Sequence, residues 1–234
     1  MKIQPFIFNW KGKYENTCSI ESDLTEIFDS VTIINSEDEF TKPEWKNLGD
    51  SAYFTEQFLT ALNLFDGDVL FHIQGDVSYS NWKQLVEDAK TYYEKFNWGI
   101  YSPNVDYSWY DSKQADIKSI EFDESNLKMV SCTDCTVWFI HKDIINLFKE
   151  SKVDFSQYKM GWGFDLILCA ISHLNNRPVI RDYAHTVDHP QGTNYNSNLA
   201  MTEMADLKEK LPQDIKEVVD DIHGDIENIS KYYL

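Results

Sequence analysis

Residues 69–81, VLFHIQGDVSYSN, are the stretch from which the fold is predicted. Val69 to Ile73 form an apolar run, typical of a strand that is buried on both faces of a parallel sheet. Gly75 permits a close backbone approach, and Asp76 follows it at the end of the strand. Ligands of open α/β sheets bind beyond the carboxyl ends of the strands. The Asp76 carboxylate is therefore expected at the edge of the sheet, where a ligand would lie.

Strand and helix signals alternate outward from this stretch through the first half of the chain. Strands are predicted over 3–8, 31–35, 69–73 and 99–102, and helices near 23–29 and over 51–64 and 81–96. This order predicts an α/β fold with a mainly parallel sheet that helices cover on both faces. A site is expected in the loops that follow residues 8, 35, 73 and 102.

The second half of the chain has an α+β pattern from Lys113 onward. Strands are predicted over 118–122, 127–140 and 178–183, helices over 142–149 and 164–174, and further helices after Met201. A chain of 234 residues can bury one substantial core, and no linker-like or low-complexity stretch interrupts it. The sequence therefore predicts a single domain.

The charge of the chain limits its partners. Its formal net charge is -18, from 39 acidic and 21 basic residues, which repels polyanions and disfavours nucleic acid as a partner. Much of the acidic surplus follows Asp206 in a predicted amphipathic helix, where a solvated face is the simpler explanation.

Neither a signal peptide nor a membrane span is predicted. The N-terminal stretch MKIQPFIFNW has only a short apolar run, which Pro5 breaks, and no apolar stretch is long enough to cross a bilayer. A soluble, cytoplasmic protein is therefore expected, and its oligomeric state stays open.

The cysteines raise the question of a zinc site, because Cys132 and Cys135 form a C-x-x-C pair. They lie in LKMVSCTDCTVWFI, which is predicted as a strand, and residues three apart in a strand point to opposite faces. With Cys18 and Cys169, they are expected to be unpaired, buried thiols.

A group of candidate metal ligands follows the last predicted strand. His185, Asp188 and His189 lie close together there, and imidazole combined with the Asp76 carboxylate suits Mn²⁺. A hard cation that bridges a diphosphate needs an oxygen ligand of this kind. The alternatives are that Asp76 only caps the turn after its strand and that the histidines are surface residues that bind nothing.

The segment Gly161-Trp162-Gly163-Phe164-Asp165 places an acid at the start of a predicted helix. Asp165 could accept a proton from an attacking hydroxyl, or it could complement the helix dipole. Several aromatic residues in predicted loops could hold a sugar ring or serve packing: Trp10, Tyr79, Trp82, Tyr107, Trp109, Tyr110 and Trp162.

Three common motifs are absent from the sequence. It has no G-x-x-x-x-G-K-[ST], no G-x-G-x-x-G after a strand and no G-x-S-x-G. Their absence disfavours a P-loop enzyme, a dinucleotide oxidoreductase and an α/β-hydrolase.

Asn9-Trp10, Asn35-Ser36 and Gly75-Asp76 each follow a predicted strand, and Gly-Trp-Gly-x-Asp and a late His come after them. Taken in order, these segments resemble the GT-A glycosyltransferases, most of all small bacterial or phage-type members. The resemblance spans about residues 3–196, and residues 161–165 are similar to the GWGxD-type segment of inverting galactosyltransferases. It implies a single Rossmann-like GT-A domain over 1–200, with a nucleotide-sugar part at 1–103, an acceptor and catalytic part at 104–200, and an acidic helical extension at 201–234.

The same resemblance implies particular site residues. Asp76 stands where the last acid of a D-x-D motif binds the metal ion, Mn²⁺ or Mg²⁺, that bridges the donor phosphates. The triplet here, residues 74–76, lacks the first acid, so a late His is expected to complete the metal shell, His189 before His185. Donor binding is implied for Asn9, Trp10, Ser36, Gln74, Gly75 and Asp76, and sugar or acceptor binding for Thr133, Asp134, Gly161, Trp162, Gly163 and Trp109.

The implied reaction moves a sugar from a nucleoside-diphosphate sugar, a UDP-sugar first, to a hydroxyl of a carbohydrate or another acceptor. Asp165 would be the general base of an inverting displacement. One alternative is a sugar nucleotidyltransferase, although the loop at 9–13, NWKGK, is basic without being Gly-rich. The other is a carbohydrate-binding protein without turnover, which the coincidence of Asp76, Asp165 and the late histidines disfavours.

Overall fold

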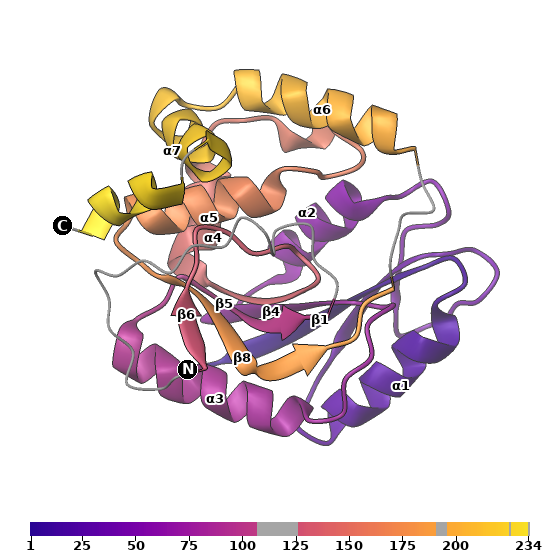
Figure 1. Cartoon of the computed structure of the whole chain (residues 1–234). Coiled ribbons are helices and arrows are strands. Elements are labelled where there is room, and N and C mark those ends of the chain that lie inside the picture. The colour runs from indigo at the N-terminus through magenta and orange to yellow at the C-terminus, as the bar shows by residue number, and fades with distance from the viewer. Residues whose placement is uncertain (107–125, 191–195, 225, 234) are drawn as a thin grey trace.

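The computed structural model of the chain describes residues 1–106, 126–190, 196–224 and 226–233 (Figure 1). The predicted strand at 118–122 and the candidate aromatic residues Tyr107, Trp109 and Tyr110 lie outside the described residues. Within the described residues, no helix is both long enough and apolar enough to cross a membrane.

The strands of the described residues form one eight-stranded sheet in the order β3-β2-β1-β4-β7-β5-β8-β6. Their bounds are β1 Ile3–Trp10, β2 Thr32–Ser36, β3 Lys46–Asn47, β4 Val69–Gln74, β5 Ile100–Val105, β6 Leu127–Met129, β7 Val137–His141 and β8 Val179–Val187. β1, β2, β3 and β4 are mutually parallel, as are β5 and β8, whereas β7 runs antiparallel between β4 and β5. The predicted mainly parallel sheet is confirmed.

The parallel register aligns the ends of three strands. Asn9 of β1 pairs with Asn35 of β2, and Phe8 of β1 pairs with Gln74 of β4. The residues that follow these three strands therefore meet at one edge of the sheet.

Helices cover both faces of the sheet, as predicted (Figure 1). α1 and α3 lie on one face and α2, α4 and α5 on the other, with α6 and α7 outside α5. The bounds are α1 Tyr14–Thr25, α2 Phe54–Leu64, α3 Trp82–Phe96, α4 Lys142–Glu150, η2 Phe155–Gln157, α5 Phe164–Leu174, α6 Ser197–Glu209, α7 Gln213–Gly224 and η3 Ile226–Tyr233.

β4 is the centre of the structure, as its apolar sequence indicates. Residues 69–73 are completely buried between the two helical layers. The ring of His72 packs against Phe8 and Trp138, and burial lowers the pKa of His72 to about 3. The imidazole is therefore neutral near pH 7 and acts as a core residue.

The C-terminal helices are part of the same core. Val218, Val219 and Ile222 of α7 are buried and pack with residues of α5. The hydroxyl of Tyr233 bonds to His173 Nδ1 at 2.7 Å and to the Arg177 carbonyl oxygen at 3.0 Å, which fixes the end of η3 on α5. The acidic segment therefore covers apolar surface as well as carrying charge.

Three predicted elements are wrong in their bounds. The first helix runs over Tyr14–Thr25 instead of 23–29, because Thr17, Ile20 and Leu24 supply a buried stripe at helical spacing. The predicted strand 127–140 is two strands, because its halves pair with β8 and with β4 and β5. Cys132 and Cys135 therefore lie in the connecting loop, and both are free thiols.

The third of these elements is the last predicted strand, 178–183, which extends to Val187 as β8. His185 therefore belongs to a strand, and of the two predicted metal-binding histidines only His189 lies beyond it. This difference in bounds places the two histidines in separate surroundings.

Gly75 is required by close packing at the end of β4. A Cβ atom there would lie 2.5 Å from Thr17 Oγ1 and 2.7 Å from the Phe8 carbonyl oxygen, and the Gly75 amide donates to that same oxygen. Because the Phe8 carbonyl is fixed in the sheet, Gly75→Ala is expected to lower the free energy of unfolding by about 1–3 kcal/mol. Urea denaturation measures this. Ser78→Ala, which truncates an exposed side chain nearby, should change it by less than about 0.5 kcal/mol, and an equal loss in both variants would contradict the packing argument.

Candidate functional site

Asp76 and His189 meet at the edge of the sheet. Ser78 and Asp188 exchange two backbone hydrogen bonds, of 2.9 and 3.0 Å, which join the segment after β4 to the segment after β8. His189 Nε2 then lies 3.8 Å from Asp76 Oδ1. The His189 amide also donates to Asp106 Oδ1 at 2.7 Å, which anchors this residue beyond β5.

The side chains of this pair keep unused hydrogen-bonding capacity. Within the described residues, Asp76 Oδ1 and His189 Nδ1 are buried and have no hydrogen-bond partner. The pKa of Asp76 is raised, because the effect of burial exceeds the opposing effect of the charges of His189 and Lys13. Buried polar atoms are rarely left without a partner, so this arrangement indicates a site for a ligand.

The pair fits a divalent metal ion. A carboxylate oxygen and an imidazole nitrogen each lie about 2.1 Å from a bound metal, so one ion can span the 3.8 Å between Asp76 and His189. One carboxylate and one imidazole are a donor set that suits Mn²⁺. Two protein ligands meet here among the described residues, which leaves positions for phosphate oxygens.

The start of α1 is fixed beside this pair. Asn16 Nδ2 donates to the carbonyl oxygens of Gly75 and Val77, both at 2.8 Å, on either side of Asp76. Lys13 is the N-cap residue of the same helix, and its charge acts on Asp76. A cationic side chain and a helix N-terminus therefore face the region where an anion would bind.

Asn9 and Asn35 form a buried support under the site. Asn9 Nδ2 donates to Asn35 Oδ1 at 2.6 Å, and Thr17 Oγ1 donates to Asn9 Oδ1 at 2.8 Å. Gln57 Nε2 donates to the carbonyl oxygen of Asn9 at 2.8 Å. The structure thus places Asn9 in the interior, while the neighbouring Trp10 is half-buried at the surface of the sheet edge.

A residue that the sequence analysis missed follows β2. Glu37 is 1% exposed, and both of its carboxylate oxygens lack a hydrogen-bond partner in the described part of the chain. The hydroxyl of the adjacent Ser36, a predicted donor-binding residue, is likewise buried without a partner. The sequence carried no signal for Glu37, because residues 37–39 read as an acidic surface loop, Glu-Asp-Glu.

Asp165 and Gln74 border the loop between β6 and β7. Gln74 Nε2 donates to the Cys135 carbonyl oxygen at 3.3 Å, and burial together with the charge of Asp165 raises the pKa of the Cys135 thiol. Asp165 is 8% exposed in the first turn of α5. The loop at 130–136 is therefore close to Asp165 and also to the end of β4.

The two glycines around Trp162 have left-handed backbones, with φ of +73° at Gly161 and +94° at Gly163. A Cβ atom at Gly161 would lie 2.4 Å from Phe54 Cδ1, so only glycine fits there. The loop is held from outside by Glu203 of α6, whose Oε2 accepts from the amide of Met160 at 2.7 Å. This tight turn delivers Asp165 to the start of α5.

Thr133 and Asp134 lie in the same connecting loop as Cys135. Thr133 is buried, and its Oγ1 lies 2.9 Å from Ser102 Oγ and 3.3 Å from Arg181 Nη2, so its side chain is held by protein groups. Asp134 is half-buried, and its Oδ1 accepts from the Thr136 amide at 3.3 Å. Of the two, Asp134 is the better placed to reach a ligand.

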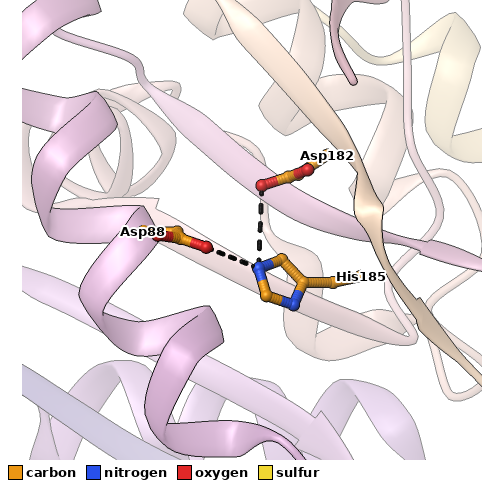
Figure 2. Close-up of side chains that lie close together, drawn as sticks. All are labelled: Asp88, Asp182 and His185. Atoms are coloured by element: carbon orange, nitrogen blue, oxygen red, sulfur yellow. Dashed lines mark hydrogen bonds and ion pairs between the residues drawn. The ribbon is translucent and has the colours of Figure 1, made fainter. Parts of the chain in front are cut away.

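His185 lies in a different cluster from His189. Its Nε2 is 2.8 Å from Asp88 Oδ2 on α3 and 3.8 Å from Asp182 Oδ2 on β8 (Figure 2). The Tyr79 hydroxyl lies 2.5 Å from the other ring nitrogen, Nδ1. The structure therefore brings Asp76 together with His189 and gives His185 other partners.

Comparison with solved structures identifies the fold. The chain is similar to GalNAc-T7, solved with UDP, GalNAc and Mn²⁺, with a TM-score of 0.64 and 10% identity over 99% of this chain and 54% of that one. It is also similar to residues 1–349 of TarS from S. aureus, solved with UDP-GlcNAc, with a TM-score of 0.57 and 13% identity over 98% of this chain and 72% of that one. The chain thus spans about half the length of the GalNAc-T7 chain and has the GT-A fold.

Sequence comparison gives no further assignment. No protein-family model matches the chain, and no curated protein matches it significantly.

Proposed function

We propose that this protein is a glycosyltransferase that uses a nucleoside-diphosphate sugar and a divalent metal ion, Mn²⁺ first. The observation that carries the proposal is the meeting of Asp76 and His189 beyond the carboxyl end of β4 in a GT-A fold, with Asp76 Oδ1 lacking a hydrogen-bond partner among the described residues. The two similar structures contain UDP or UDP-GlcNAc, and one of them contains Mn²⁺, which supports a nucleotide-sugar donor.

The donor diphosphate would lie between the Asp76–His189 pair and the start of α1. The bound metal would neutralise the charge that develops on the leaving nucleoside diphosphate. Lys13 and the first-turn amides of α1 would add positive potential on the same side. These features compensate for the acid that is missing at Gln74.

Asp165 would act as the general base of an inverting displacement. Its position in the first turn of α5, bordering the loop at 130–136, suits a carboxylate that faces an acceptor hydroxyl. The hydroxyl oxygen would attack C1 of the sugar, its proton would pass to Asp165, and the bond from C1 to the phosphate oxygen would break. Asp134 in the loop at 130–136 and Trp162, three residues before Asp165, are both half-buried and would contact the sugar or the acceptor.

Glu37 would recognise the nucleoside. A buried carboxylate accepts hydrogen bonds and donates none, so its natural partners are an N–H of the base or a ribose hydroxyl. Uracil offers such an N–H, as guanine and cytosine do, and the nucleotides in the two structures compared above are UDP and UDP-GlcNAc. This argument favours a UDP-sugar.

The test is a calorimetric screen of UDP, GDP and CDP and of their sugars, each with and without Mn²⁺. Binding of one nucleotide that requires Mn²⁺, followed by transfer to a hydroxyl acceptor, is the expected result. Release of pyrophosphate from a nucleoside triphosphate would instead identify a sugar nucleotidyltransferase. Donor binding without turnover under any metal or acceptor would identify a binding protein.

Glu37→Gln is expected to weaken UDP binding about 10- to 100-fold, because the amide cannot replace a charged acceptor. The thermal midpoint of the ligand-free protein should not fall, since the change removes a buried carboxylate that has no hydrogen-bond partner among the described residues. Calorimetry with UDP and a melting curve measure both quantities. Glu39→Gln, which changes an exposed acid two residues further on, is the control and should leave both unchanged. Unchanged UDP affinity in Glu37→Gln would remove Glu37 from the donor site.

A further inference from the structure

A second group of metal-type ligands lies between β8 and α3. Asp88, Asp182 and His185 each direct one ligand atom to a common point, and these atoms all lie within 4.8 Å of one another (Figure 2). We propose that this group binds a Zn²⁺ ion, separate from the metal at Asp76 and His189.

Burial and charge favour a cation at this point. His185 is 3% exposed and Asp182 is 1% exposed, so the group is largely removed from water. Two carboxylates and one imidazole have a net charge of -1 even when the imidazole is protonated, and of -2 when it is neutral. Buried charge of this kind is unfavourable unless it is compensated, and a divalent cation would neutralise both carboxylates.

The distances from His185 Nε2 to the two carboxylates can be compared with those of tetrahedral zinc. With zinc at about 2.0–2.1 Å from each ligand, the ligands of a tetrahedral site lie about 3.3–3.4 Å apart. The distances from His185 Nε2 to Asp88 and Asp182, 2.8 and 3.8 Å, lie on either side of that value. The Asp88 side chain is 24% exposed, so a water molecule can reach the fourth position.

Two tyrosines hold the ligands in place. The Tyr101 hydroxyl donates to Asp182 Oδ2 at 2.6 Å, and the Tyr79 hydroxyl lies 2.5 Å from His185 Nδ1. With the imidazole proton on Nδ1, bonded to the Tyr79 oxygen, the lone pair of Nε2 is available to the metal, as in many zinc sites.

The site would link the two segments that form the donor site. Tyr79 follows Asp76 by three residues, and His185 precedes His189 by four. The backbone pairing of Ser78 with Asp188 lies between them. Zinc at this point would therefore stabilise the arrangement that presents Asp76 and His189, without contacting the donor.

Titration of chelator-treated protein with Zn²⁺ alone, without nucleotide, tests the proposal. The measurement is made in the Asp76→Asn variant, in which the donor metal site is disabled, so that the result does not depend on the proposed function. One equivalent of Zn²⁺ is expected to bind and to raise the thermal midpoint. In the same background, Asp88→Asn should weaken binding by more than about 100-fold, and Tyr79→Phe by about 10- to 100-fold.

Glu87→Gln, on the exposed side of α3, is the matched control and should bind Zn²⁺ as the parent does. Circular dichroism of the metal-free variants tests whether each is folded. If Asp88→Asn does not fold, the Zn²⁺ affinity of Tyr79→Phe decides the question. Absence of Zn²⁺ binding, or binding that neither variant weakens, would overturn the proposal and leave the group as a buried ion pair.

Discussion

Asp165→Asn is expected to lower the rate of sugar transfer by about 10²- to 10⁴-fold, because the amide cannot accept the proton of the attacking hydroxyl. Donor affinity should stay within about twofold, since Asp165 belongs to the first turn of α5 and the proposed metal ligands Asp76 and His189 follow other elements, β4 and β8. Single-turnover transfer with saturating donor, together with calorimetry of UDP and Mn²⁺, measures the two effects separately.

A purely structural role for Asp165 predicts a different result. As a complement to the dipole of α5, the carboxylate would contribute only about 0.3–1 kcal/mol to stability. The variant would then melt at a lower temperature and still transfer sugar at nearly the parental rate. Parallel loss of donor binding and transfer would contradict the separation of roles between Asp165 and Asp76.

Asp76→Asn is expected to abolish the dependence of UDP binding on Mn²⁺. In the parent protein Mn²⁺ should raise UDP affinity by more than tenfold, and this increase should disappear in the variant, because one of two protein ligands has lost its charge. Calorimetric titration of UDP with and without Mn²⁺ gives both affinities.

Stability provides the control for this variant. The Asp76 carboxylate is buried with one oxygen that lacks a hydrogen-bond partner among the described residues, and burial raises its pKa. Removing that charge should leave the melting temperature of the metal-free protein unchanged or higher. A variant that loses binding because it unfolds would melt lower, and a variant whose UDP affinity still rises with Mn²⁺ would exclude Asp76 as a ligand.

His189→Gln should also reduce the dependence of UDP binding on Mn²⁺, but less than Asp76→Asn does, because it removes the second ligand of the pair. Unchanged Mn²⁺ dependence in this variant would indicate that water or phosphate oxygens complete the metal shell.

The sequence by itself determined the α/β class and the main strands. The apolar run at 69–73 and its counterparts at 3–8 and 31–35 are local signals, because burial on both faces of a parallel sheet requires an apolar residue at nearly every position. The placement of Asp76 and Gly75 at the sheet edge followed from the same run. The helix at 14–25 was missed because its buried stripe includes Thr17, which reads as polar.

Only the tertiary structure decided which residues meet. His185 and His189 are four residues apart and chemically alike, yet β8 continues to Val187, so that one turns to Asp88 on α3 and the other to Asp76. The burial of Glu37 could not be predicted from the sequence either, because exposure depends on contacts with distant segments. An acidic loop has the same sequence pattern whether it is buried or exposed. Local sequence sets which elements form, whereas the pairing of strands far apart in the chain sets which side chains share a site.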